Sequence, residues 1–423
     1  MSAPSTPAAA AAVLTDDEEL PTALQRLAAP ELIALLAFSM ALTALGIDLM
    51  LPAFGQIRAT FGLASDSNAT SGLVTTYFIG LAVGQLGFGI IADSFGRRRA
   101  LYIGYVIYGI GAVAALLAPT FGMLLGARVL WGVGAAGGRV VTLAVIRDTW
   151  SGDKMSRAMS FVMAVFITVP ILAPALGTVI IAVGHWRWTF GFCAIAAAAV
   201  SLWAMRLPET LAVENRRELS FARLAEAGRF VFADRQTVLS GLAITSLYAV
   251  FTSWIASSEL IITDVFDRGA QFPLIFGGLA VMLGLGMLLN ARVVERFGTR
   301  RVTGVAMTGY VVATAVLLAV VLASDGRPAF WAFIPVLGVI LGAHALLVPN
   351  VNSLAMERMG AVAGTASAIV GAMQVAGGAL LGRLIDGAFD GSLTPMAIGF
   401  AFYGVMAAVL LRFALRAPTS VSA

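Results

Sequence analysis

The sequence predicts an all-α membrane protein with twelve transmembrane helices, arranged as two six-helix pseudo-repeat bundles. Of its 423 residues, 59% are hydrophobic and only 12% are charged, and the mean hydropathy is +0.92. A soluble domain carries about 25% charged residues, so this composition excludes a water-soluble enzyme. The apolar residues gather in runs that can cross a bilayer, which takes about 20 residues of helix. A short charged motif also occurs twice and divides the chain into halves.

The hydrophobic runs define the predicted spans one by one. We expect helices at 32–54, 72–92, 101–118, 121–146, 157–182, 188–205, 238–263, 273–293, 302–322, 330–352, 361–385 and 394–412. A membrane β-barrel would instead show alternating segments of about 10 residues. The spans group into an N-terminal bundle at 31–206 and a C-terminal bundle at 238–414. The stretches outside them predict a disordered tail at 1–30, a linker at 207–237 and a second tail at 415–423.

The distribution of arginine and lysine predicts the orientation in the cytoplasmic membrane. If the N-terminus is cytoplasmic, twenty of the 27 basic residues fall on the cytoplasmic side and five on the opposite side. Because basic residues collect in cytoplasmic loops, both termini and the linker are expected in the cytoplasm. The linker stretch 221–232 is amphipathic, which suits either a helix on the membrane surface or a solvated linker helix.

The two halves share a charged motif after their second span. Residues 93–99 read DSFGRRR, and residues 295–301 read ERFGTRR, 202 positions later. Each copy has an acid, then Phe-Gly, then a pair of arginines. Parallel six-span repeats place the substrate site at their interface near the middle of the membrane.

The first copy and several other stretches carry a family resemblance. Residues 89–101 (GIIADSFGRRRAL) resemble the loop 2–3 signature of the major facilitator superfamily. The stretches IDLMLP (47–52), GQLGFG (84–89), RVLWGVGAA (128–136), PILAPALG (170–177), WRWTF (186–190), LPETL (207–211) and GTASAIVGAMQ (364–374) resemble its Bcr/CflA drug-exporter branch. Two departures stand out: Val169, Ala173 and Thr178 replace glycines of the span-five antiporter signature, and Trp131 stands where the branch often has Gln.

The resemblance implies the major facilitator fold and proton-coupled efflux of hydrophobic drugs or antibiotics, with amphenicol-like, bicyclomycin-like or multidrug substrates. Two alternatives remain open: proton-coupled uptake of a metabolite, and a non-transporting membrane sensor. An enzyme is not expected, because one cysteine and two distant histidines offer no metal or catalytic constellation. The chain lacks a phosphate-binding loop, so the expected energy source is the proton gradient, with no cofactor. The expected partners are a small-molecule drug, protons and lipid, and no nucleic acid. The protein is expected to be a monomer.

Asp48 and Arg128 are the predicted proton-coupling pair. A carboxylate in the middle of span one costs about 2.5–3.5 kcal/mol if it stays charged, which favours its neutral form and reversible protonation. In the resembled family, an acid at this position is linked to proton and substrate binding, which makes Asp48 a candidate for substrate binding as well. A buried Arg128 in span four needs acceptors, either a coupling partner or a static clamp of carbonyl oxygens. In the resembled family, the matching arginine couples protonation to conformation.

Two motifs are expected to control conformation. In the loop 2–3 signature, an acid at the end of span two can face a helix N-terminus of the other half and lock the inward side shut. This gating motif comprises Gly89, Asp93, Gly96, Arg97 and Arg98. The antiporter motif of span five comprises Pro170, Pro174 and Gly177, where the prolines would kink the helix.

The remaining candidates are weaker. Five aromatic residues could stack on an apolar or cationic ligand: Tyr77, Trp131, Tyr248, Phe251 and Trp254. Three charged or titratable groups are secondary candidates: Glu259, for which exposure at the membrane interface is expected, His344, which could shuttle protons, and Arg139, which could snorkel. Asp386 and Arg383 are expected to form a local surface pair.

Overall fold

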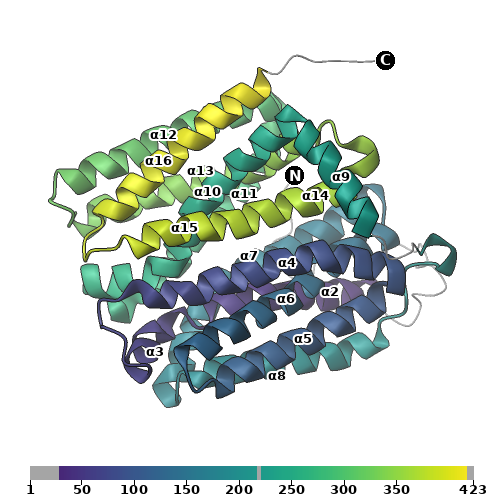
Figure 1. Ribbon diagram of the computed structural model, residues 1–423, viewed down its shortest axis with the longest axis horizontal. Helices are drawn as coiled ribbons and strands as arrows, with labels where there is room; N and C mark the ends of the chain where they lie inside the picture. The colour runs from purple at the N-terminus through teal and green to yellow at the C-terminus, as the bar shows by residue number, and fades with distance from the viewer. Residues whose placement is uncertain (1–27, 217–220, 417–423) are drawn as a thin grey trace, which may run out of the picture.

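The computed structural model describes residues 28–216 and 221–416, and every regular element within them is helical (Figure 1). In these residues twelve helices are long and apolar enough to cross a membrane, which confirms the predicted fold class. The expected tails fall largely at 1–27 and 417–423, outside the described residues.

The N-terminal half supplies six spans. They are α2 (Ala29–Asp48) continued by η2 (Leu51–Ala53) and α3 (Phe54–Thr60), α4 (Ser71–Phe95) preceded by η3 (Asn68–Thr70), α5 (Arg97–Leu117), α6 (Phe121–Thr149), α7 (Gly152–Val183), and α8 (Arg187–Trp203) with η4 (Ala204–Arg206). The linker begins with a short turn, η5 (Val213–Asn215), and continues as α9 (Phe221–Ala233).

The C-terminal half supplies the other six. They are α10 (Arg235–Leu260) continued by the π-helix η6 (Ile261–Val265), α11 (Phe272–Phe297) preceded by η7 (Gly269–Gln271), α12 (Thr299–Leu322), α13 (Phe330–Met356), α14 (Ala363–Ala372) continued by the π-helix η9 (Met373–Gly377) and α15 (Gly378–Gly387), and α16 (Thr394–Leu415). A turn, η8 (Gly360–Val362), leads into α14.

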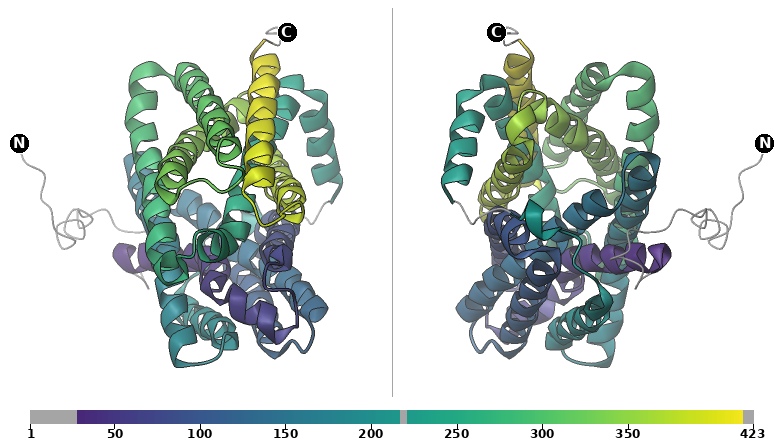
Figure 2. Two further views of the ribbon diagram at one scale, coloured as in Figure 1. Left: turned by 90° about the vertical axis from the view of Figure 1, so that its left-hand side faces the viewer. Right: turned by 90° about the vertical axis from the view of Figure 1, so that its right-hand side faces the viewer.

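The two halves lie against each other along two seams. One seam packs α4 against α10, α14, η9 and α15, and the other packs α7 against α11. Figure 2 shows the division, with the purple-to-blue helices on one side and the green-to-yellow helices on the other. Side chains that reach across these seams therefore contact both halves, and their contacts must change when the halves move relative to each other.

Because successive spans alternate in direction, the loops gather at two ends. The arginine-rich end holds the loops near 96, 150, 207–234, 298 and 357–362. The opposite end holds the loops at 61–67, 118–120, 184–186, 266–271, 323–329 and 388–393.

The linker helix α9 packs on the C-terminal half. Its Ala227 and Val231 are buried against a small apolar cluster that includes Ala366 and Ile369 of α14, while Phe230 and Phe232 remain exposed. The amphipathic pattern of α9 thus corresponds to one face that packs on α14 and another face that is left exposed.

Candidate functional site

Asp48 ends α2 where span one breaks. The chain turns at Leu49 and Met50 and resumes as η2, in which Pro52 has no N–H to continue the helical ladder. Asp48 is only 3% exposed, and it makes no hydrogen bond or ion pair with any residue that the structure describes. Asp48 is therefore a buried carboxylate without a countercharge, and it lies where the helix of span one is interrupted.

Gly177 of the predicted antiporter motif packs directly on this break. A Cβ at Gly177 would lie 2.2 Å from the carbonyl oxygen of Leu49 and 3.4 Å from Cγ of Pro52. Pro170 and Pro174 both lie inside α7, which carries Gly177. The motif therefore sets how closely α7 can approach the backbone next to Asp48, and only glycine permits this approach.

A substitution of Gly177 tests this contact. We expect Gly177→Ala to destabilise the fold by about 1–3 kcal/mol, as overpacking does in a close-packed interior. Thermal unfolding of the purified protein, together with transport activity, measures the effect. The matched control is Gly87→Ala, because a Cβ at Gly87 of α4 would meet no atom within 4 Å. Equal stability and activity of the two variants would contradict the packing role.

Arg128 lies wholly inside the N-terminal bundle. Its Nη1 donates to the carbonyl of Gly46 at 2.7 Å and its Nε to the carbonyl of Leu73 at 3.1 Å. Its guanidinium carbon lies 4.4 Å from the ring centre of Tyr77 and 4.8 Å from that of Trp131. No carboxylate within the described residues pairs with it. Arg128 is thus a clamp of α6 that binds backbone carbonyl oxygens of α2 and α4. One of these carbonyls, that of Gly46, lies two residues before Asp48 in the chain.

A cavity of about 540 Å³ opens between the halves toward the arginine-rich end. From the N-terminal half its walls come from α4 and α6, including Gln85, Gly89, Asp93 and Arg139. From the C-terminal half its walls come from α10, α13, η8, α14 and η9: Tyr248, Val348, Asn352, Val362, Gly364, Thr365, Ser367, Ala368, Gly371 and Gln374. Both repeats therefore contribute to one concave site at their interface.

The predicted aromatic residues divide between this cavity and the protein interior. Only Tyr248 of the five belongs to the cavity lining. Tyr77 and Trp131 are completely buried around Arg128, and Trp254 stacks on Phe276. Phe251 stacks on the imidazole of His344 with ring centres 4.9 Å apart, directly beside Tyr248. Within the described residues, Nδ1 of His344 has no hydrogen-bond partner.

The gating motif forms a compact ion cluster at the mouth of the cavity. Arg97 is buried and binds the carboxylates of Asp93 and Asp148, the latter at 2.8 Å from Nε. Glu209 accepts the backbone N–H groups of Arg97 at 2.7 Å and Arg98 at 3.3 Å, so it caps the first turn of α5.

Gly96 fits this turn because its φ is +94° and a Cβ would collide with Glu209. The charges of the cluster belong to the N-terminal half and, with Glu209, to the start of the linker. Asp93 lines the same cavity as Gly364 and Thr365 of the first turn of α14, but within the described residues it pairs with Arg97 and makes no bond to that turn. The lock between halves that we expected of Asp93 is therefore open in this structure.

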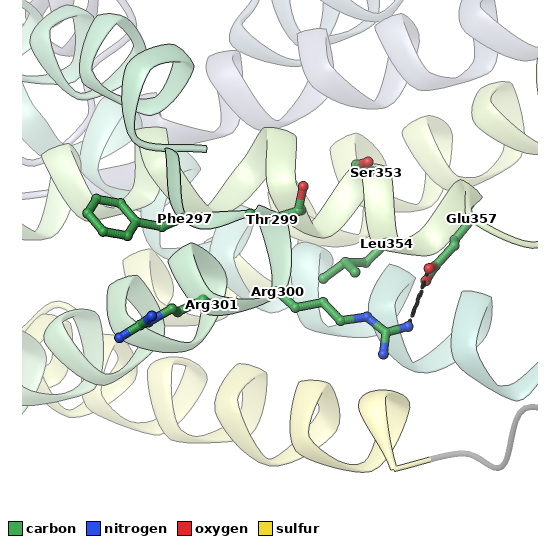
Figure 3. Close-up of a pocket in the computed structure, with 8 residues that line it drawn as sticks. Phe297, Thr299, Arg300, Arg301, Ser353, Leu354 and Glu357 are labelled. Carbon is green, nitrogen blue, oxygen red and sulfur yellow. Dashed lines mark hydrogen bonds and ion pairs between the residues drawn. The ribbon is translucent and has the colours of Figure 1, made fainter. Parts of the chain in front are cut away.

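The second copy of the motif repeats the geometry in the C-terminal half. Gly298 has φ +77°, and α12 starts at the next residue, as α5 does after Gly96. Arg300 pairs with Glu357 at 3.1 Å, in a shallow pocket of about 480 Å³ (Figure 3). Hydrogen bonds from Gln236 and from Arg300 hold the pKa of Glu357 below its usual value. The sequence repeat is thus also a structural repeat.

The opposite end is closed by polar contacts between the halves. Arg58 of α3 binds Glu259 of α10 at 3.0 Å and Asp264 of η6 at 3.5 Å. Glu259 is only 5% exposed. The expectation of interfacial exposure for Glu259 is therefore wrong, because Arg58 covers it and neutralises its charge.

A second set of contacts lies beside this ion pair. Asn68 donates to Ser257 at 2.9 Å and to the backbone carbonyl of Asp386 at 3.1 Å. Ser253 and Ser257 donate to the buried carboxylate of Asp386 at 2.6 and 2.9 Å. Arg383 donates to Ser71 of α4 at 2.9 Å. The expected surface pair of Asp386 and Arg383 is also wrong. The carboxylate of Asp386 is buried against two serines of its own half, and Arg383 reaches Ser71 across the interface.

We call these residues the latch: Arg58, Asn68 and Ser71 of the N-terminal half, and Ser253, Ser257, Glu259, Arg383 and Asp386 of the C-terminal half. The sequence alone assigns no functional role to Arg58, Asn68, Asp148 or Glu209. Glu209 did stand in a stretch that carried the family resemblance, LPETL (207–211). Arg58 and Asn68 had no such signal, because their partners are about 200 to 320 positions away.

Comparison with known proteins agrees with this architecture. Residues 36–382 match the family described as Major Facilitator Superfamily. An uncharacterized MFS-type transporter, YdgK, of Bacillus subtilis is 28% identical over 388 residues, which cover 89% of this chain and 92% of the relative. A bicyclomycin resistance protein homolog of Haemophilus influenzae is 24% identical (83% and 87% covered), and a chloramphenicol resistance protein of Pseudomonas aeruginosa is 27% identical (81% and 80% covered).

Solved structures agree on the fold. The crystal structure of a D-xylose–proton symporter has a TM-score of 0.74 at 16% identity, and the alignment covers 91% of this chain and 97% of that one. At this identity the likeness concerns the fold alone. Twelve spans, a repeated loop motif and the family match over most of the length lead to one conclusion: the chain is a multi-pass membrane transporter that belongs to the Major Facilitator Superfamily.

Proposed function

We propose that the protein exports hydrophobic drugs or antibiotics from the cytoplasm in exchange for protons, by alternating access. In this proposal the arginine-rich end faces the cytoplasm, as the distribution of basic residues favours. Relatives named as bicyclomycin and chloramphenicol resistance proteins support export of drugs. The protein would lie in the cytoplasmic membrane, with both termini inside, and would act as a monomer without a cofactor.

The single observation that carries proton coupling is the unpaired, buried Asp48 at the break of span one. A carboxylate that no cation and no hydrogen bond holds in place is free to take up and release a proton as its surroundings change. The break, with Gly177 of α7 packed against Leu49, gives the backbone next to Asp48 a place to change conformation. Protonation can therefore be linked to a change between the halves.

The contacts between the halves supply the second requirement, alternate access. The latch is closed at the opposite end, whereas the cavity opens at the arginine-rich end and the Asp93 cluster makes no bond to α14. This arrangement corresponds to an inward-facing state that can load a drug from the cytoplasm. In the outward-facing state, the latch would open and Asp93 would face the N-terminus of α14.

Everted membrane vesicles test the direction and the driving force. Respiration acidifies the lumen of such vesicles, and the cytoplasmic face of the protein points outward. We expect wild-type vesicles to accumulate chloramphenicol in the lumen, and a protonophore to abolish the accumulation. Drug leaving the lumen with the protons would instead support uptake. Absence of any gradient-dependent flux, with retained ligand binding, would support the sensor alternative.

A further inference from the structure

The wall of the cavity carries three carboxamide side chains. Gln85 comes from α4 of the N-terminal half, whereas Asn352 of α13 and Gln374 of η9 come from the C-terminal half. Gln85 is 8% exposed and Gln374 4% exposed. We call these three residues the amide cluster. It brings hydrogen-bonding groups from both repeats into the wall of one cavity, which opens toward the arginine-rich end.

One atom of this cluster is poised for a ligand. Oε1 of Gln85 is buried and has no hydrogen-bond partner among the described residues. It lies 3.4 Å from the position of a Cβ on Gly371, so it reaches across the interface to α14. On the other side, Asn352 donates to Oε1 of Gln374 over a long 3.5 Å. Buried polar groups are normally paired, and an unpaired acceptor in a cavity wall calls for a donor from a bound molecule.

The backbone supports the same location. Gln374 lies in the π-helix η9, which interrupts the α-helix of span eleven between α14 and α15. Such π-helical turns are rare and occur frequently at functional sites. Gln374 thus sits at the only change of helix type in this span, where the spans of both halves meet.

The charges of the lining select against cations. Its two carboxylates, Asp93 and Asp148, are both bound to Arg97. Arg139 also lines the cavity and has no hydrogen-bond or ion-pair partner within the described residues, and Arg147 is a further cation of the lining. The other buried acids, Asp48, Glu259 and Asp386, are absent from the lining. A cationic drug would lose its hydration shell here and meet no free carboxylate in return.

We propose that the amide cluster is the recognition subsite for an uncharged molecule that carries amide or hydroxyl groups. A carboxamide offers both donors and an acceptor, so Gln85 and Gln374 can grip such a group from the two halves at once. The ring of Tyr248, also in the lining, packs on the apolar part of the molecule. This inference rests on the proposed export function, because it names the substrate class of the same cavity.

Equilibrium binding tests the subsite without relying on transport. The probe is chloramphenicol, a neutral molecule with an amide and two hydroxyl groups, dialysed against the purified full-length protein in lipid nanodiscs. We expect Gln85→Leu and Gln374→Leu each to raise the Kd on the order of tenfold, the effect of one or two lost hydrogen bonds. Gln56→Leu, the same change at an exposed glutamine of α3, should leave the Kd unchanged. Thermal unfolding verifies that each variant is folded.

A permanent cation supplies the opposite probe. We expect tetraphenylphosphonium, which has no hydrogen-bonding group, to bind the wild type more weakly than chloramphenicol does. Gln85→Glu adds an unpaired carboxylate to the wall and should reverse this preference.

The outcomes separate the two proposals. Three results would each overturn the amide subsite: an unchanged Kd in both leucine variants, no saturable chloramphenicol binding by the wild type, or tighter binding of the cation by the wild type. Gradient-driven export in vesicles would still stand after any of them. Conversely, specific binding with the expected loss in Gln85→Leu, but without gradient-driven flux in vesicles, supports the subsite and overturns proton-coupled export.

Discussion

Vesicles that contain Asp48→Asn are expected to lose accumulation of drug against its gradient, down to the level of vesicles without the protein. Asparagine has the shape of the protonated acid but cannot exchange a proton. The cavity, the latch and the Arg128 clamp do not involve the Asp48 side chain, so the conformational cycle itself should persist. Exchange of labelled for unlabelled drug without a proton gradient should therefore continue in the variant.

This separation of uphill transport from exchange distinguishes a proton carrier from a structural acid. The matched control is Asp66→Asn, at an exposed aspartate in a loop of the opposite end, which should transport as the wild type does. The Asp48 variant should be at least as stable as the wild type, since the change removes a buried unpaired carboxylate. If it still accumulates drug uphill, Asp48 is structural and the proton site moves to Glu259 or His344.

The sequence predicted this region well because its signals are local. Burying a carboxylate in a run of apolar residues is costly wherever the helix packs, so Asp48 stood out without any knowledge of its neighbours. The same holds for the repeated acid-x-Phe-Gly motif, whose glycines both take positive φ in the structure. Hydrophobic runs also predict the twelve spans, because span length follows from bilayer thickness alone.

Contacts between the halves could not be predicted in this way. Hydrophobicity indicates that a helix is buried, but it does not say which residue of another span faces Glu259 or Asp386. Both acids were therefore placed at surfaces, whereas Arg58 and two serines cover them. Gln85 and Gln374 do not stand out in the sequence either, because a carboxamide in a membrane span carries no charge. Only the cavity that they share gives them a role.

Breaking the Arg58–Glu259 ion pair of the latch is expected to have the second large effect, which is on the balance between the closed-latch and open-latch conformations. Removing one partner of a buried ion pair costs about 3–5 kcal/mol, because the other charge is left uncompensated. The Arg58–Glu259 pair is buried and joins the halves. Glu259→Gln, which keeps the volume of the side chain, should therefore shift the ratio of closed to open latch by roughly a hundredfold or more. The measurement is the distance between spin labels at Ala59→Cys and Gln271→Cys, both exposed at this end, in a Cys193→Ala background.

Asp264→Asn is the matched control for this latch variant, because Asp264 binds the same guanidinium at 3.5 Å but its side chain is 39% exposed. A half-exposed pair contributes at most about 1 kcal/mol, so this variant should keep the short label distance of the wild type. Glu259→Gln should instead populate a longer distance and leave the cavity at the arginine-rich end less accessible, since opening one end closes the other. A label distance that stays short in Glu259→Gln would mean that Asn68, Arg383 and Asp386 hold the halves together without the ion pair.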